Sequence, residues 1–348
     1  MGSAMVRNAV SAIAGCAVLL LTVLALCGCA PSAKAVTFSN PIVPVGQDPF
    51  VAQWGHRYLL IEERGDNEIW IRESKPDDLT GIAHGSSHRV WVAPTTGSHC
   101  TDVWAPELHH IGSHWYIYYS ATTCDGDNAG HRNFVLESSG DDPLGSYLDR
   151  GQLGGSANAW AIDGTEFAWH SRRYFVWSGW PNGSGSEQDL FIARMSSPTA
   201  LGSAPVILSR PTLSWERHGA PIEEGPEALA HGGRMFLVYS ASGSWTDDYR
   251  YGLLRLTGSN PLDPTSWAKA PRSVFASANG VYGPGHGSFV RSPDGSQSWM
   301  IYHSAIAQGS GWDRQVDAQP FTWKSDGSPD FGAPRPEDAD IPVPAGQH

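Results

Sequence analysis

The chain repeats one pattern of apolar and polar positions five times between Asp48 and about Phe331. In each repeat an alternating stretch runs into a short polar or glycine-containing turn, a second apolar stretch follows, and a third alternating stretch comes after it. Residues of a strand point alternately to two faces, so the pattern predicts β-strands joined by tight turns. The second stretches carry the aromatic residues Tyr58, Trp115, Tyr174, Phe236 and Trp299.

The spacing of roughly 60 residues between these aromatic residues predicts the fold. Radially repeated units of several antiparallel strands are typical of a β-propeller, whose blades are four-stranded sheets. We therefore expect an all-β, five-bladed β-propeller that forms a single domain over residues 41–348, after a linker at residues 30–40. A β-sandwich would not explain so long a period. The third stretches are expected at residues 69–72, 134–137, 190–194, 251–256 and 320–324.

The first 29 residues resemble an export signal. Arg7 precedes an almost wholly apolar run over residues 9–26. Leu26-Cys27-Gly28-Cys29 resembles a bacterial lipobox and predicts a lipid on Cys29, whereas Ala33-Lys34-Ala35 is an alternative cleavage site that would release the protein. An uncleaved membrane anchor is a third interpretation. All three place the folded part outside the cytoplasm, either on the cell surface or secreted.

Two cysteines, Cys100 and Cys124, lie beyond this segment. In an exported chain such a pair more often forms a disulfide than two free thiols, so we predict a Cys100–Cys124 bond. Neither cysteine has a CxxC spacing, which disfavours zinc.

Composition narrows the class of partner. A formal net charge of −12 argues against nucleic acid, whose phosphates require basic patches, and suits a neutral substrate. The 15 tryptophans are more than a typical chain carries, and flat apolar rings suit the C–H faces of saccharides.

Carboxylates recur at the starts of the predicted first strands. In a propeller these strands line a central channel and begin at one face, so the preceding side chains should converge on one pocket. Carboxylates that gather in such a pocket repel one another and separate their pKa values, which creates the acid and the base that glycosidic bond cleavage needs. The converging residues are expected to be Asp48, Trp104, Glu107, Asp163, Glu224 and His286.

At these positions the sequence resembles glycoside hydrolase family 43. The motifs that carry the resemblance are Asp48-Pro49, Trp104-Ala105-Pro106-Glu107, Ile162-Asp163-Gly164, Glu224-Gly225-Pro226 and Gly283-Pro284-Gly285-His286-Gly287, with Tyr302-His303-Ser304 and Arg314 as looser matches. A related clan that acts on fructans carries Arg-Asp-Pro where this chain has Ile162-Asp163-Gly164, which disfavours that assignment.

The resemblance implies hydrolysis with inversion. Asp48 would be the general base, Glu224 the general acid, and Asp163 the residue that orients Glu224 and raises its pKa, while Glu227 would have no catalytic part. The base and acid carboxyl groups are then expected roughly 6.5–9.5 Å apart. The residues expected to contact the substrate are Trp104, Glu107, Trp180, Tyr282 and Arg314.

The resemblance also implies a cation on the propeller axis. Family members often hold calcium or another ion there with a histidine and waters, which here points to His286. Calcium prefers oxygen ligands, so the ion would be held mostly by water. No organic cofactor is expected.

The loops most resemble those of exo-acting α-L-arabinofuranosidases that release terminal α-1,5-linked arabinose. The expected substrates are plant cell-wall polysaccharides or oligosaccharides, arabinan first and arabinoxylan second. A β-D-xylosidase or an endo-α-1,5-arabinanase on the same scaffold is an alternative, and a non-catalytic carbohydrate-binding propeller is another, although a binding site would not need three acids. We expect a monomer that touches a membrane only through its N-terminal lipid.

Overall fold

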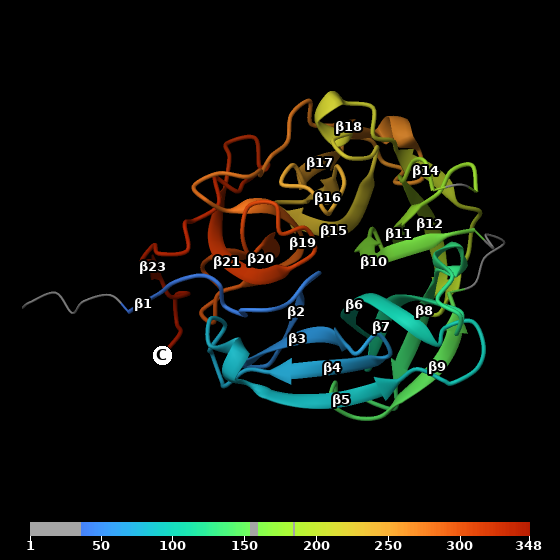
Figure 1. Ribbon diagram of the computed structural model, residues 1–348, viewed down its shortest axis with the longest axis horizontal. Helices are drawn as coiled ribbons and strands as arrows, with labels where there is room; N and C mark the ends of the chain where they lie inside the picture. Colours follow the sequence, from blue (N-terminus) through green and yellow to red (C-terminus); the bar gives the residue numbers. More distant parts are fainter. Residues whose placement is uncertain (1–35, 154–158, 184) are drawn as a thin grey trace, which may run out of the picture. The chain divides into compact units, whose positions relative to one another are not determined.

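The structure, a computed structural model, describes residues 36–153, 159–183 and 185–348. Within residues 36–348, five antiparallel sheets follow one another around a common centre (Figure 1). The prediction of an all-β, five-bladed propeller is therefore confirmed. The export signal and Cys29 lie outside the described residues. In the part of the chain that is described, no helix is long and apolar enough to cross a membrane.

Each blade consists of strands that are consecutive in the chain, and we number the blades 1 to 5 in that order. The first strands are β2 (Phe50–Trp54), β6 (Thr101–Ile111), β10 (Ala161–Trp169), β15 (Glu223–His231) and β19 (Tyr282–Arg291). The second strands are β3 (Arg57–Arg64), β7 (His114–Thr122), β11 (Arg172–Gly179), β16 (Arg234–Ala241) and β20 (Ser298–Ala305). The third strands are β4 (Glu68–Glu73), β8 (Arg132–Ser138), β12 (Asp189–Ser197), β17 (Arg250–Leu256) and β21 (Arg314–Trp323).

The outer strands are shorter. They are β5 (Ser86–Val92), β9 (Tyr147–Gln152), β18 (Trp267–Lys269) and β22 (Pro329–Asp330), and in blade 3 both β13 (Ala200–Leu201) and β14 (Val206–Ser209) pair with β12. Single turns of 3-10 helix occur at η1 (Ile82–His84), η2 (Asn128–Gly130), η3 (Ser214–Glu216) and η4 (Pro264–Ser266).

The first strands form the inner ring. Each contacts the first strand of the next blade, including β19 with β2, so the ring closes. The second strands are buried along most of their length because neighbouring blades cover both of their faces. All five aromatic residues that marked the repeat are buried at these blade interfaces.

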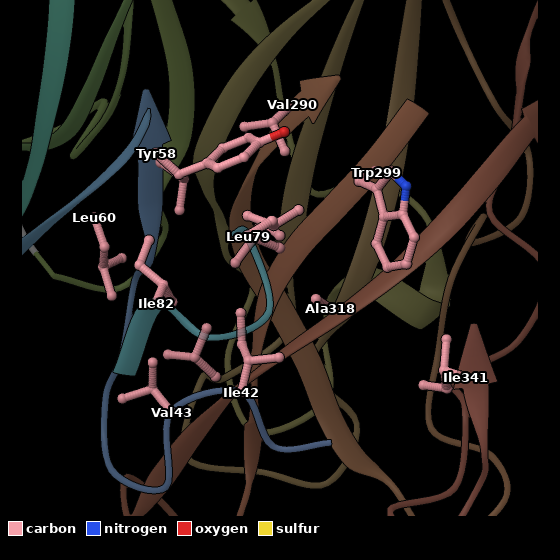
Figure 2. Packing of buried hydrophobic residues seen from close by; sticks show 13 residues of the cluster. Ile42, Val43, Tyr58, Leu60, Leu79, Ile82, Val290, Trp299, Ala318 and Ile341 are labelled. Atoms are coloured by element: carbon pink, nitrogen blue, oxygen red, sulfur yellow. The ribbon is translucent and has the colours of Figure 1, made fainter. Parts of the chain in front are cut away.

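Blades 5 and 1 close the ring without sharing a strand. Ile42, Val43 and Leu60 pack there against Trp299 and Ala318 (Figure 2). At the same junction β1 (Thr37–Phe38) pairs with β23 (Ile341–Pro342), so the two ends of the fold meet.

Two sequence expectations differ from this arrangement. The predicted linker at residues 30–40 extends too far, because β1 is part of the fold and the side chain of Asn40 makes two hydrogen bonds with the backbone of Ala318. The third strand of blade 5 was expected at residues 320–324, whereas β21 begins at Arg314. Its first half buries polar residues, among them Gln315 and Asp317, so no apolar alternation marks it.

A disulfide joins Cys100 to Cys124. Cys100 directly precedes β6 and Cys124 follows β7, so the bond closes the open end of the first hairpin of blade 2.

Candidate active site

An irregularity near the start of the first strands turns side chains toward the axis. The pairing register shifts once in β10 and β15 and twice in β6 and β19, and Asp48 lies two residues before β2. A residue with a left-handed backbone conformation, with φ between 30° and 55°, stands at each shift and at Asp48. Bulges of this kind re-aim side chains, and positive φ at non-glycine residues is typical of functional sites. Each blade has one such residue at a matching position, and these are Asp48, Ala105, Asp163, Gly225 and His286. β6 and β19 each have a second one at their other shift, Asp102 and Gly283.

Glu224 stands one residue earlier than this set. The strand register aligns it with Trp104 and Ile162, while Gly225 takes the left-handed position. Although a carboxylate precedes the first strand in blades 1, 3 and 4, Glu224 does not take the position that Asp48 and Asp163 occupy. Position 225 has no space for a side chain, because a Cβ there would lie 2.7 Å from Cγ of His286. Because residue 225 is glycine, His286 of blade 5 and Glu224 of blade 4 can both line the central pocket.

The bulges open into a pocket of about 520 Å³. The predicted residues on its wall are Asp48, Trp104, Asp163, Glu224, His286 and Arg314. The structure therefore brings the three carboxyl groups, the histidine and the arginine together. Further wall residues that the sequence did not single out are Asn128, Trp160, Gln188, Trp245 and Trp312. The three tryptophans among them lie between the repeated strands rather than in them. Tryptophans outside the repeat were therefore the sequence signal that could have identified these wall residues.

Three predicted substrate contacts are not on this wall. The structure places Trp180 behind Trp160, with parallel rings 4.5 Å apart. Glu107 lies past the bulge of β6, buried, with Oε2 2.8 Å from Nε2 of His109. Tyr282 pairs with Ala305 at the start of β19. Trp180 thus supports a wall residue, and Glu107 belongs to a buried hydrogen bond with His109.

Asp48 is held through one carboxylate oxygen. Oδ1 lies 3.1 Å from Nδ1 of His286, 3.1 Å from Nδ1 of His303 and 3.5 Å from Nη1 of Arg314. No ion pair within the described residues reaches Oδ2, so that oxygen remains available to accept a proton. Burial raises the pKa of Asp48, but His286 and then His303 outweigh burial and hold it well below the ordinary value. Asp48 is therefore ionised at neutral pH.

Glu224 has the opposite protonation state. Burial and the neighbouring Asp163 carboxylate raise the pKa of Glu224 to about 8, even though the Tyr249 hydroxyl donates to Oε1 at 2.9 Å. Burial and the charge of Asp48 raise the pKa of Asp163 to about 6. Asp163 also accepts the backbone N–H of Gly225 on Oδ2 at 3.1 Å, which fixes the residue next to Glu224. At pH 7 the pocket therefore holds one protonated carboxyl group and two ionised ones.

Replacing Asp163 with asparagine should move the alkaline limb of the pH–activity profile to lower pH. The negative charge of Asp163 contributes to the raised pKa of Glu224, so its loss should lower that pKa, by on the order of one unit. Asparagine keeps an oxygen that accepts the N–H of Gly225, so Glu224 should stay in place. The measurement is kcat/KM from pH 5 to 10, and an alkaline limb that stays near pH 8 would contradict the coupling.

His286 does not fit the calcium ligand that the sequence suggested. Burial lowers the pKa of His286, but Asp48 and Asp163 outweigh it and raise this pKa to about 10. The imidazole is therefore protonated at neutral pH, and a metal ligand must be the neutral form. The described residues also contain no group of three or more His, Cys, Asp or Glu side chains that could hold a metal ion. We derive no catalytic step through a cation.

We accordingly expect that dialysis against EDTA leaves both kcat and the melting temperature unchanged. His286 pairs with Asp48, so its ring is not available as a metal ligand. A loss of activity that calcium restores and magnesium does not restore would instead establish a calcium ion held mainly by water.

Known proteins resemble this chain over most of its length. The model of the family described as glycosyl hydrolases family 43 matches residues 38–329. The extracellular exo-alpha-(1->5)-L-arabinofuranosidase of Streptomyces avermitilis is 34% identical over 318 residues, which cover 88% of this chain and 65% of that protein. Alpha-L-arabinofuranosidase 43 of Humicola insolens is 33% identical over 322 residues, 89% of this chain and 66% of that protein. The chain thus spans about two thirds of the length of these curated relatives.

The fold has a close match among solved structures. The crystal structure of alpha-L-arabinofuranosidase from Lactobacillus brevis superposes with a TM-score of 0.80 at 32% identity. The match covers 87% of this chain and 98% of that one.

Proposed function

The chain belongs to glycosyl hydrolase family 43, and we propose that it is an inverting exo-α-L-arabinofuranosidase that releases terminal arabinofuranose from α-1,5-linked arabinan or arabino-oligosaccharides. The observation that carries the proposal is the pair of opposite protonation states, ionised Asp48 and protonated Glu224, in one tryptophan-lined pocket. Glycosidic bond cleavage with inversion requires such a pair, one group for the water and one for the leaving oxygen.

In the proposed reaction, Asp48 and Glu224 each act through one oxygen of the carboxyl group. Water attacks the anomeric carbon while Oδ2 of Asp48 takes its proton. At the same time the bond to the leaving oxygen breaks, and Glu224 gives that oxygen a proton. Because Oε1 of Glu224 accepts the Tyr249 hydroxyl, the transferred proton is assigned to Oε2. The new C–O bond forms on the face opposite the broken one, so the anomeric configuration inverts.

The pocket wall supports a neutral sugar. Trp104, Trp160, Trp245 and Trp312 supply apolar faces, and Asn128 and Gln188 supply uncharged hydrogen-bonding groups. Arabinofuranose is favoured over xylose because the relatives named above are called arabinofuranosidases. Arabinoxylan is a second proposed substrate, since it presents terminal arabinofuranose on a different backbone.

The proposed site of action is outside the cytoplasm. The Streptomyces avermitilis relative is named extracellular, and residues 1–29 have the pattern of an export signal. We propose a monomer that a lipid on Cys29 holds at the cell surface. Replacing Cys29 with serine should then shift the enzyme from the membrane fraction to the medium, and an unchanged distribution would contradict the anchor.

A substrate panel tests the activity. We expect hydrolysis of an aryl α-L-arabinofuranoside, little turnover of the aryl β-D-xyloside, and arabinose as the sole early product from linear arabinan. Proton NMR of the first-formed sugar should show the inverted β-anomer. A ladder of oligosaccharides would establish endo action, and preference for the xyloside would establish a xylosidase. If none of the substrates were hydrolysed, the alternative of a non-catalytic carbohydrate-binding propeller would be favoured.

A further inference from the structure

A serine in three of the blades ties each second strand to the next blade. These serines occupy the same register, directly across from the residue that precedes the bulge. Their side chains bond the backbone of the following blade at 2.8–3.1 Å, and the pairs are Ser120 with Asp163, Ser178 with Glu223 and Ser240 with His286. A small hydroxyl is therefore sufficient for this connection.

Blade 5 has a histidine where blades 2, 3 and 4 have this serine. His303 pairs with Gly285 in β19, and its Nδ1 lies 3.1 Å from the backbone nitrogen of Asp48. The ring is fully buried and lies parallel to the ring of Tyr249, with centroids 5.6 Å apart. It thus faces the same backbone position of the next blade as Ser120 and Ser240 do, at the junction that closes the propeller.

The imidazole adds a contact that the serines do not make. The same Nδ1 lies 3.1 Å from Oδ1 of Asp48. One nitrogen of a neutral ring cannot both accept the backbone N–H and donate to the carboxylate, and the tautomer with its proton on Nδ1 donates to Oδ1. His286 and Arg314 also reach Oδ1. Nε2 of His303 is buried without a hydrogen-bond partner among the described residues. All polar contacts of this ring are therefore with Asp48.

We infer that His303 is a positioning residue for Asp48, which donates Nδ1–H to Oδ1 of that residue so that Oδ2 meets the attacking water. The inference rests on the proposed function, since it presumes that Asp48 activates water. It does not require His303 to exchange a proton. Because burial and the charge of Arg314 lower the pKa of His303 to about 3, the ring stays neutral throughout the working pH range.

The chain supplies its own control substitution. His303→Ser introduces the residue that blades 2, 3 and 4 use, so the blade connection should survive and the melting temperature should fall by a few degrees at most. The contact with Oδ1 should be lost. We expect kcat to fall on the order of 10–100-fold with KM changed less than about threefold, because misplacement of a reacting group acts on the chemical step.

Two further variants separate positioning from packing. Asparagine can place its amide near the position of Nδ1, whereas glutamine places its amide near Nε2. His303→Asn should therefore recover most of kcat and His303→Gln should not, although both fill the buried site. Equal kcat in the two variants, or full activity in His303→Ser, would overturn the inference.

The choice of substrate keeps this test separate from that of the function itself. The defect of His303→Ser should persist on an aryl arabinofuranoside with a good leaving group, because water must still be activated. If wild-type enzyme hydrolyses this substrate and Asp48→Asn does not, the proposed function stands whatever His303 does. A His303→Ser defect that disappears with the good leaving group would overturn the positioning role alone.

Discussion

Glu224→Gln should lower kcat on linear arabinan by roughly 10²–10⁴-fold, the usual contribution of a general acid. The carboxyl group of Glu224 is protonated at neutral pH because burial and Asp163 raise its pKa to about 8, and it is therefore ready to protonate the leaving sugar oxygen. A glutamine amide cannot supply that proton. The variant should fold normally because glutamine keeps an oxygen that accepts the Tyr249 hydroxyl.

The leaving group provides the control for this variant. When the substrate is an aryl arabinofuranoside of a strongly acidic phenol, the phenolate departs without protonation. On that substrate Glu224→Gln should therefore retain much more of the wild-type rate. The measurement is kcat on both substrates, with affinity for arabino-oligosaccharides followed by calorimetry. An equal loss on both substrates would remove Glu224 from the acid role.

Asp48→Asn should cause a loss of similar size, roughly 10²–10⁴-fold in kcat, and on both substrates alike. An asparagine cannot take the proton of the attacking water, and water is the nucleophile whatever the leaving group. Asparagine retains an oxygen for the contacts that His286, His303 and Arg314 make with Oδ1. Binding of arabino-oligosaccharides should therefore persist.

Removal of the negative charge of Asp48 should also change the pKa of His286. Burial lowers the pKa of His286, and the Asp48 carboxylate is the main group that raises it, so this pKa should fall in Asp48→Asn. NMR titration of the imidazole measures that change, and circular dichroism checks the fold. If Asp48→Asn kept wild-type kcat with a normal fold, the base would have to be another carboxylate, and Asp163 on the same wall is the next candidate.

The fold could be predicted from the sequence because each blade repeats one local pattern. Second strands such as β7 and β20 are covered on both faces, so their apolar runs are long and easy to recognise. The third strand of blade 5 was misplaced because β21 buries hydrogen-bonded polar side chains in its first half. The pairing of β1 with β23 joins residues about 300 positions apart and leaves no periodic signal.

The candidate site was predictable where the backbone repeats. Asp48, Asp163 and His286 each occupy the left-handed position of their blade. The offset of Glu224 was not predictable, because it depends on the space that His286 takes beside Gly225. Glu107 was placed on the pocket wall because it closely follows Trp104, yet the bulge between them changes which side chains face the pocket.

The meeting of β1 and β23 makes the fold a candidate for circular permutation. Thr37 pairs directly with Pro342, so a short peptide could connect the two ends of the propeller. New ends could then open in the bend between β8 and β9, where Asp141 and Asp142 are exposed. A permuted chain that keeps kcat would show that the junction of blades 5 and 1 holds Asp48 in place through its contacts alone, whatever the order of synthesis.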